Sequence, residues 1–318
     1  MSPKIFIAGH KGMVGSAFYR QIKKNKSNSQ IFVKSKKQLD LTKEKNVYKF
    51  FEKNKFDQVY LCAARVGGIL ANMNYPVDFL LDNIKIQNNI ITACHKYGVK
   101  NLIFIGSSCI YPKNISRKIK ETDILTGELE KTNEAYALAK ITGIKLIQSI
   151  NQQYKKYNNF KILMPCNLYG PNDNYHANNS HVIAALIRKF STAKKKKLKN
   201  ITIWGTGKPR REFMYVDNFA KAAIFFMKKK IHNHKNENYL INIGCGDDLT
   251  IKDLVIKLSK IFDYKGKITF DKNKPDGVKR KLLNINKARK LGWRFKENFD
   301  YELKNHINKE NFFEKNFT

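Results

Sequence analysis

The chain contains little cysteine, tryptophan or proline, and the cysteine pattern narrows the classes of protein to which it can belong. Its 318 residues include five cysteines, two tryptophans and seven prolines. The cysteines form no CxxC motif and no even-numbered framework, which favours a reduced, cytoplasmic chain over a disulfide-stapled one. His232 and His234 resemble a metal-binding pair but have no third ligand nearby. We therefore predict a solvated loop there and no metal site.

Long apolar runs are also missing. Runs such as Ala222–Met227 fall far short of the roughly 18 residues that a membrane span needs. The apolar residues Ile5–Ala8 near the amino terminus are too few for the core of a signal peptide. We therefore expect a cytoplasmic protein that does not enter a membrane.

Acidic residues are scarce as well. The chain has 26 Asp and Glu against 61 Lys and Arg, which gives a formal net charge of +35. Lysine supplies 52 of these basic residues and arginine only 9, whereas surfaces that read bases or clamp phosphates favour arginine. The densest run, Lys194–Lys197, has no interleaved aromatic residues. We expect no specific nucleic-acid binding, although a basic nucleic-acid-binding protein remains the alternative from another class.

What is present is a regular alternation of short apolar segments and helical ones. The expected strands are 4–8, 31–33, 58–62, 101–106 and 161–164, and the clearest helices between them are 76–95 and 134–154. Repeated units of this length predict an α/β fold with a Rossmann-type, doubly wound parallel sheet. We assign this dinucleotide-binding domain to residues 1–170.

The pattern becomes less regular after residue 170, and we expect a smaller C-terminal α/β substrate lobe over 171–318. Its expected elements are a helix at 181–192, a strand at 201–204, a helix at 217–229, a strand at 239–243 and a helix at 250–262. Thr250 is the expected N-cap of the last helix. The segment 212–243 is expected to return to the first domain, and the polar tail from Asn298 is expected to be peripheral.

A glycine-rich turn joins the first strand to the first helix. Gly9, Gly12 and Gly15 form a GxxGxxG loop, and glycine allows both a tight turn and a close approach of the backbone to a pyrophosphate. The free N–H groups of the helix start would then face the phosphates. The loop predicts a dinucleotide site.

The residues that end the second strand indicate which dinucleotide is bound. NAD-binding chains usually place Asp or Glu there, whereas this strand ends in Lys34, Ser35, Lys36 and Lys37. Cations and a hydroxyl group suit a 2′-phosphate, so we predict NADP (as NADPH) over NAD.

Three further residues predict a proton-transfer site. Tyr136 and Lys140 are four residues apart on an expected helix and so share one face, where the ammonium group is expected to lower the pKa of the phenol. Ser107 follows an expected strand at the edge of the sheet where such folds bind ligands.

Eight stretches carry a family resemblance over nearly the whole length. They are FIAGHKGMVGSA (6–17), VGGILANMNYPVDF (66–79), IGSSCIYP (105–112), TNEAYALAKITGIKL (132–146), NLYGPNDNYH (167–176), NSHVIAALIRKF (179–190), WGTGKPRREFMYVDN (204–218) and KPDGVKRKLLN (274–284). With these stretches the chain resembles the extended short-chain dehydrogenase/reductases that act on nucleotide sugars, and more narrowly the GDP-L-fucose synthase family. That resemblance implies 3,5-epimerisation of GDP-4-keto-6-deoxy-D-mannose, then NADPH-dependent reduction at C4.

The resemblance also implies roles for individual residues. The implied catalytic residues are Ser107, Tyr136 and Lys140 for reduction and Cys109 and His181 for epimerisation. The implied cofactor positions are Gly9, His10, Lys11, Gly12, Met13, Val14, Gly15, Lys36, Lys37, Gln38, Leu39, Asp40, Leu41, Ile105, Gly106, Ser107, Ser108, Lys140, Pro165, Cys166, Asn167, Leu168 and His181. The implied substrate contacts are Lys189, Trp204, Arg211, Asp276 and Lys281, the last for the diphosphate. Lys36 and Lys189 stand where the resemblance implies Arg, which weakens bidentate phosphate contact.

Three other nucleotide-sugar activities are alternatives on the same fold. The resemblance implies an acidic pair after the triad hydroxyl of a 4,6-dehydratase, whereas Ser108 and Cys109 follow Ser107 here, which disfavours that activity. A nucleotide-sugar 4-epimerase shares the triad but needs neither Cys109 nor His181, and a dideoxysugar synthase would keep much the same scaffold. A GDP-sugar substrate and a homodimer are what the resemblance implies about partners.

Overall fold

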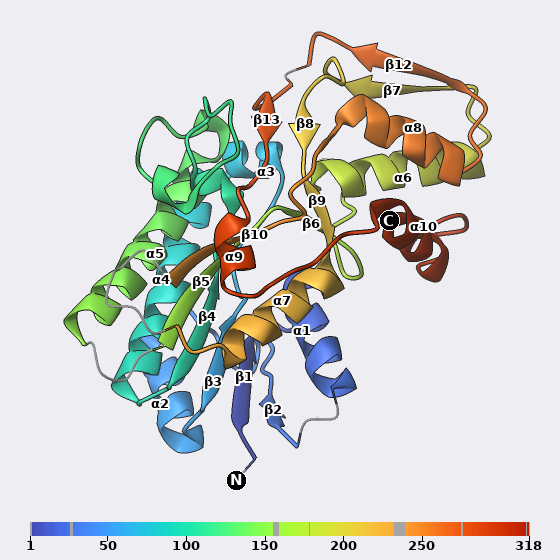
Figure 1. The fold of residues 1–318 in the computed structure, drawn as a ribbon. Coiled ribbons are helices and arrows are strands. Elements are labelled where there is room, and N and C mark those ends of the chain that lie inside the picture. Colours follow the sequence, from blue (N-terminus) through green and yellow to red (C-terminus); the bar gives the residue numbers. More distant parts are fainter. Residues whose placement is uncertain are drawn as a thin grey trace.

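The computed structural model of the chain describes residues 2–25, 28–154, 159–177, 179–231, 239–274, 276–315 and 317. Its central sheet has six strands in the order β10-β5-β4-β3-β1-β2, and every neighbouring pair is parallel (Figure 1). These strands are β1 (Lys4–Ala8), β2 (Gln30–Phe32), β3 (Gln58–Leu61), β4 (Asn101–Ile105), β5 (Asn159–Pro165) and β10 (Leu240–Ile243). The predicted Rossmann-type doubly wound sheet is confirmed.

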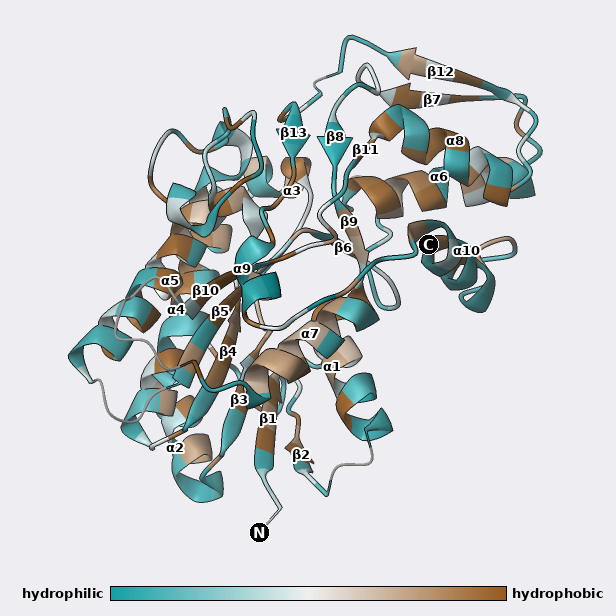
Figure 2. Ribbon diagram, viewed as in Figure 1, coloured by the Kyte–Doolittle hydropathy of each residue, from teal (hydrophilic) through white to brown (hydrophobic). Residues whose placement is uncertain are grey.

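Helices cover both faces of this sheet. On one face α1 (Met13–Lys24) packs against α7 (Val216–Lys228), and on the other lie α2 (Glu44–Asn54), α4 (Pro76–Lys96) and α5 (Glu134–Gln153) (Figure 1). Because both faces are covered, the strands are mostly apolar rather than regularly alternating, and β1 and β5 are largely brown in Figure 2. Phe6, Tyr60 and Phe104 on neighbouring strands are all buried in this core.

A second core lies in the C-terminal part of the chain. There α6 (Val182–Lys195), α8 (Ile251–Ile261) and α10 (Phe299–Lys309) pack around β7 (Asn200–Trp204) and its parallel partner β12 (Lys267–Asp271). Thr250 caps α8 as predicted, since its hydroxyl accepts a hydrogen bond from the Asp253 N–H.

The expectation of a peripheral tail from Asn298 is wrong. Leu303, Ile307 and Phe312 are fully buried in the second core, and Ser191 on α6 donates a hydrogen bond to the Phe312 carbonyl. The tail is polar on average, but its few apolar residues fall on one side of α10 and just after it, which is sufficient to bury them.

Short elements connect the two cores. The strands β6 (Asn167–Tyr169) and β9 (Phe213–Tyr215) pair in parallel, and β8 (Arg210–Arg211) lies between β11 (Leu249–Thr250) and β13 (Arg280–Lys281). The remaining helices are α3 (Ile69–Asn74), α9 (Asn286–Lys290) and the 3-10 turns Ser108–Ile110, Glu121–Asp123 and Lys131–Asn133. The chain therefore passes between the two cores several times.

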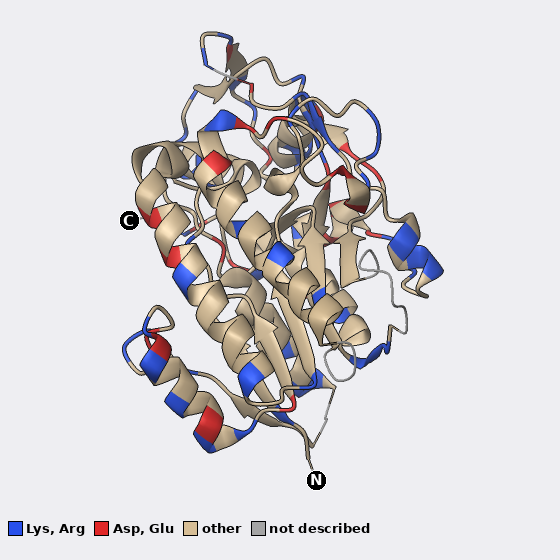
Figure 3. Ribbon diagram, turned by 90° about the vertical axis from the view of Figure 1, so that its left-hand side faces the viewer, with Lys and Arg blue, Asp and Glu red and all other residues tan. Residues whose placement is uncertain are grey.

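The large positive charge is dispersed rather than gathered on one element. Figure 3 shows Lys and Arg on helices and loops of all parts of the chain that face the viewer. Among the described residues, no helix has the length and apolar character needed to cross a membrane.

A fully buried lysine lies in the central sheet. Lys161 in β5 is fully buried beside Ile103 of β4, and within the described residues its ammonium group has no hydrogen-bond partner. Burial lowers the pKa of Lys161 to about 7 from its ordinary value of 10.5. Keeping this charge in the folded sheet is therefore costly.

We predict that Lys161→Met raises the melting temperature near neutral pH. Between pH 7 and 10.5 the unfolded chain binds more protons at this position, so the free energy of unfolding of the wild type should rise with pH, by at most about 1.4 kcal/mol per unit. Lys161→Met should flatten that rise, whereas Lys49→Met, at an exposed position of α2, should not. Thermal melts from pH 6 to 10 measure the effect, and parallel curves for all three proteins would contradict it.

Candidate functional site

The carboxyl ends of the parallel strands open into a cavity of about 1380 Å³ between the central sheet and the second core. This is the edge at which doubly wound sheets bind their ligands. The predicted residues that line it are Gly9, Gly12, Met13, Val14, Gly15, Lys36, Leu39, Asp40, Leu41, Ile105, Gly106, Ser107, Ser108, Tyr136, Lys140, Pro165, Cys166, Asn167, Leu168, His181, Lys189, Trp204, Arg211, Asp276 and Lys281. His10, Lys11, Lys37, Gln38 and Cys109 are not part of its wall.

The glycine loop forms one end of this cavity. Gly9 has a φ of 89°, and the Gly12 N–H donates a hydrogen bond to its carbonyl at 3.1 Å. A Cβ on Gly15 would come within 2.2 Å of the Gly9 oxygen, so the helix start can approach the strand only with glycine there. Gly12 is the N-cap of α1, which has no acidic residue in its first turn. The first turn therefore offers unobstructed N–H groups to an anion.

The end of β2 brings positive charge to the same region, but not all predicted residues take part. Lys34 and Lys36 line the cavity. Ser35 instead donates hydrogen bonds from its N–H and hydroxyl to Gln38, which closes the turn. Lys36 and Lys37 both lie in the turn that follows β2, and of the two only Lys36 lines the cavity.

Asp40 is the carboxylate of the described cavity wall nearest to this turn in sequence, and it is already engaged. It accepts hydrogen bonds from the N–H and the hydroxyl of Thr42, and these, above all the backbone N–H, lower its pKa despite some burial.

Four predicted catalytic residues meet at the end of β4 and on α5. Ser107 accepts a hydrogen bond from the Cys109 thiol at 3.0 Å, and it also hydrogen-bonds Tyr136. The Lys140 ammonium donates to the Ile105 carbonyl at 2.9 Å and lies 5.8 Å from the centre of the Tyr136 ring. The structure thus places hydroxyl, phenol, thiol and ammonium in one group.

The expected lowering of the Tyr136 pKa does not occur in this structure. Burial and the nearby Cys109 raise the pKa of Tyr136, and the hydrogen bond from Ser107 offsets only part of that effect. Burial also lowers the pKa of Lys140 to about 8, so the charged form of Lys140 is less favoured than in water. Spacing along a helix predicted the proximity of the two groups but not the desolvation that both experience.

Cys109 also departs from expectation. We expected cations to lower the pKa of its thiol, but burial raises it, although Lys281, Ser107 and Lys140 all act in the opposite direction. The side chain is 8% exposed and lies behind Ser107 rather than on the cavity wall. In this conformation Cys109 is a protonated thiol.

His181 lies on the cavity wall at the N-cap position of α6, where its side chain makes no capping hydrogen bond. It is exposed to the interior of the cavity, while the surrounding protein lowers its pKa by desolvation. His181 is therefore a neutral imidazole near neutral pH.

The predicted substrate contacts line the end of the cavity formed by the second core. Trp204 is 53% exposed at the end of β7, and Lys189 donates a hydrogen bond to the Thr202 carbonyl. Asp276 accepts hydrogen bonds from the N–H and hydroxyl of Thr206, which fixes the turn after Trp204. The Trp204 ring is thus half exposed at the cavity, and the Lys274 ammonium group lies 5.5 Å from its centre.

The cavity also contains a residue that the sequence did not single out. Asp173 has one carboxylate oxygen that is buried without a hydrogen-bond partner among the described residues, and burial raises the pKa of this carboxyl to about 7. It lies within NLYGPNDNYH, so the motif was noticed but this residue was not. Nothing in the local pattern distinguishes it from the turn-forming Asn172 and Asn174 beside it.

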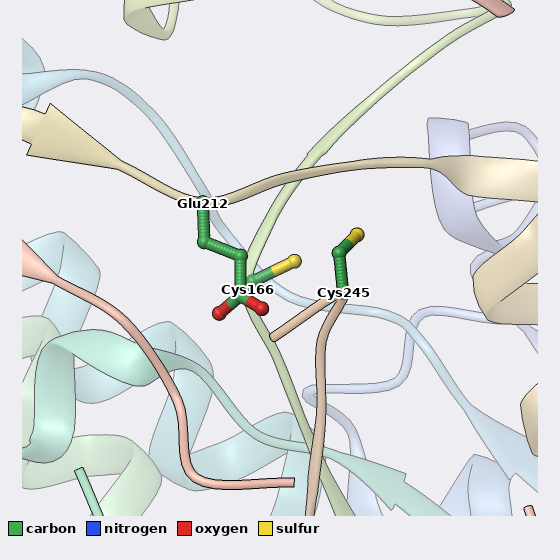
Figure 4. A group of neighbouring side chains, drawn as sticks. All are labelled: Cys166, Glu212 and Cys245. Atoms are coloured by element: carbon green, nitrogen blue, oxygen red, sulfur yellow. The ribbon is translucent and has the colours of Figure 1, made fainter. Parts of the chain in front are cut away.

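At the cavity wall, Cys166 and its neighbours Glu212 and Cys245 bring their polar side-chain atoms within 4.8 Å of one another (Figure 4). The Glu212 carboxylate accepts hydrogen bonds from the backbone N–H groups of Gly246 and Leu283, at 2.6 and 3.0 Å. Burial raises the pKa of Glu212 to about 7. The carboxylate therefore ties three separate segments together. His232 and His234, the predicted solvated pair, lie outside the described residues.

Comparison with known proteins gives the family. Residues 5–244 match the NAD dependent epimerase/dehydratase family. The chain is similar to GDP-L-fucose synthase of Escherichia coli (strain K12), at 45% identity over 91% of each chain, and to GDP-L-colitose synthase of Yersinia pseudotuberculosis, at 39% identity over 91% of this chain and 92% of the other. It is also similar to the crystal structure of a GDP-L-fucose synthetase from Naegleria fowleri bound to NADP, with a TM-score of 0.87, 27% identity, and coverage of 98% and 95%. The chain belongs to the NAD dependent epimerase/dehydratase family.

Proposed function

We propose that this protein is a GDP-L-fucose synthase: it epimerises GDP-4-keto-6-deoxy-D-mannose at C3 and C5 and then reduces C4 with NADPH. The observation that carries the proposal is the meeting of Ser107, Tyr136, Lys140 and Cys109 beside a cavity that also contains His181 and a dinucleotide loop. The similarity to GDP-L-fucose synthases over nearly the full length supports the same activity.

The cavity fits NADP at its glycine-rich end. The first turn of α1 has a glycine cap and no acidic residue, which suits a pyrophosphate, and Lys34 and Lys36 suit a 2′-phosphate. When bound, NADPH supplies the hydride for C4. Pro165–Leu168 and Lys140 are the proposed residues at its nicotinamide end.

The reduction requires a proton as well as a hydride. We assign the proton on the C4 oxygen to the Tyr136 phenol, which stays protonated because its pKa is raised. Ser107 donates a second hydrogen bond to that oxygen as negative charge develops on it. Lys140 orients Tyr136 and holds the ribose next to the nicotinamide.

The epimerisation requires one group that removes a proton from carbon and another that returns it from the opposite face. A C4 ketone acidifies the hydrogens on C3 and C5, and His181 and Cys109 form the proposed pair. They begin as a neutral imidazole and a protonated thiol, so one can accept a proton while the other donates one.

Identifying the product tests the proposal. The purified protein is incubated with NADPH and GDP-4-keto-6-deoxy-D-mannose, and in parallel with the 3-deoxy analogue that a colitose synthase would favour. We expect NADPH consumption and GDP-L-fucose from the first sugar. A C4-reduced sugar without inversion at C3 and C5 would indicate a simple reductase, and isomerisation without NADPH consumption would indicate a 4-epimerase.

The cofactor preference leads to a prediction with an internal control. Lys36→Ala should raise the KM for NADPH about tenfold, because a charge-assisted hydrogen bond to the 2′-phosphate is lost. The KM for NADH should hardly change. The neighbouring Lys37 does not line the cavity, so Lys37→Ala should leave both constants near the wild-type values. Steady-state kinetics with both cofactors measure the difference, and equal losses for NADPH and NADH would contradict phosphate recognition.

We also propose two domains, a homodimer and a cytoplasmic location. The domains are the cofactor domain 1–170, joined by 212–243, and a substrate lobe formed by the rest. All five cysteines are free thiols, which suits the cytoplasm. The exposed large apolar side chains on α4 and α5 support the dimer. They include Val77, Leu81 and Leu138. Light scattering on a sizing column measures the mass directly, and a monomer at micromolar concentration would exclude the dimer.

A further inference from the structure

The three-stranded sheet β11-β8-β13 separates two pairs of cations. In β8 and β13, Arg210 pairs with Arg280 and Arg211 pairs with Lys281 in a parallel register. Because successive side chains of a strand point to opposite faces, the first pair faces one way and the second the other. Arg211 and Lys281 line the cavity, and Arg210 and Arg280 do not.

A single carboxylate holds the pair that faces away from the cavity. One oxygen of Asp248 accepts a hydrogen bond from Arg210 Nε at 2.8 Å, and the other accepts one from Arg280 Nε at 2.6 Å. Arg210 also donates to the Asp248 carbonyl at 2.7 Å. The Asp248 side chain is 2% exposed, whereas the side chains of Arg210 and Arg280 are 41% and 37% exposed. Asp248 thus links β8 to β13 from the far side of the sheet.

On the cavity side, the two cations repel each other, and among the described residues no carboxylate hydrogen-bonds to both of them. Burial lowers the pKa of Lys281, and the charge of Arg211 lowers it further. The strands β8 and β13 have two residues each and make few backbone hydrogen bonds, so their register depends on hydrogen bonds to side chains. The Asp248 carboxylate makes such hydrogen bonds. The Glu212 carboxylate accepts another, from the Leu283 N–H beyond β13.

We propose that Asp248 is a positioning residue for the substrate diphosphate: by fixing Arg210 against Arg280, it holds Arg211 beside Lys281 as a pair of cations for the diphosphate. The inference rests on the proposed function, because it assumes a nucleoside diphosphate sugar in this part of the cavity. It assigns a role in binding to a residue that touches neither the substrate nor the cofactor.

A pure charge effect and a positioning role predict opposite changes in the affinity for GDP when Asp248 is replaced by a neutral residue. Removing a negative charge near two cations should strengthen the binding of an anion if Asp248 acts only through its charge. If Asp248 acts by fixing the register, its removal should weaken binding despite the favourable change in charge. The direction of the change therefore distinguishes the two explanations.

The experiment uses GDP as the probe and compares two neighbouring carboxylates by isothermal titration. Asp248→Asn should raise the Kd for GDP about tenfold, as expected when hydrogen bonds between charged groups are lost. Asp247→Asn makes the same change of charge at an exposed position, and its amide oxygen can still accept the bond from the Asp248 N–H, so its Kd should stay near the wild-type value. The Kd for NADPH should be unchanged in both variants. With the nucleotide-sugar substrate, Asp248→Asn should raise KM and leave kcat intact, a split that a general loss of structure would not produce.

Each outcome has one reading. Wild-type or tighter GDP binding by Asp248→Asn would overturn the positioning role. Failure of the wild type to bind GDP while it binds NADPH would instead overturn the proposed function. If Asp248→Asn does not fold, Arg280→Lys replaces it, because it keeps the charge and loses the guanidinium fork at a partly exposed position. A raised Kd for GDP in Arg280→Lys supports the role, and an unchanged Kd overturns it.

Discussion

Replacing Tyr136 by Phe should slow reduction of the 4-keto sugar by about 10²–10⁴-fold, the usual contribution of a positioned proton donor. The substitution removes one hydroxyl and keeps the ring, which packs edge-on against Phe79 with centroids 6.2 Å apart. The dinucleotide end of the cavity is untouched, so the Kd for NADPH should stay near the wild-type value. Single-turnover oxidation of NADPH measures the chemical step separately from binding.

The control for this variant is a tyrosine away from the cavity. Tyr154 follows α5 and is 45% exposed, so Tyr154→Phe should reduce NADPH oxidation hardly at all. Wild-type turnover in Tyr136→Phe would remove Tyr136 from the mechanism. A loss of NADPH binding as large as the loss of rate would show that the phenol serves the cofactor rather than the proton transfer.

Removing the Cys109 thiol should abolish epimerisation while leaving the cofactor site intact. In deuterated water with NADP⁺ and no reductant, the wild type should exchange the hydrogens on C3 and C5 of the 4-keto sugar for deuterium. Cys109→Ser should stop this exchange, because a serine hydroxyl is too weak an acid or base to replace the thiol. Mass spectrometry of the recovered sugar counts the deuterium.

Two further variants give this prediction its controls. Cys62 is a matched control, because it lines the same cavity and burial raises the pKa of its thiol as well. Since no proton transfer is assigned to Cys62, Cys62→Ser should exchange deuterium like the wild type. His181→Ala should block the return of a proton from the other face and so prevent inversion. Wild-type exchange at both carbons in Cys109→Ser would make the enzyme a 4-keto reductase that relies on other groups for any epimerisation.

The parts that the sequence predicted well are those with local patterns. The glycine loop, the strand that ends before Ser107 and the helix that carries Tyr136 and Lys140 are each encoded within about ten residues, where turn geometry and periodicity dominate. Residues that depend on distant pairings were less visible. Arg211 and Lys281 could be related to the substrate only through the family resemblance, and their pairing across β8 and β13 appears only in the folded sheet.

The titration behaviour was the least predictable property. Spacing suggested that Lys140 would lower the pKa of Tyr136 and that cations would lower that of Cys109. Burial instead raises both pKa values: Cys109 adds to the effect at Tyr136, whereas at Cys109 burial outweighs Lys281 and Lys140. Burial depends on how α5, the turn after β4 and the second core pack together, which no short motif encodes. The buried side of α10 was missed for the same reason.

The position of β10 in the sheet has a consequence for how the chain is made. β5 ends at Pro165 and pairs on one side with β10, which begins only at Leu240, so β5 is an exposed edge while the intervening residues are synthesised. Apolar edge strands recruit other chains, and a charge within them discourages that pairing. Lys161 carries its full charge in water, whereas burial in the folded sheet disfavours that charge. We therefore expect Lys161→Met to be the more stable protein once folded and the more aggregation-prone one during refolding.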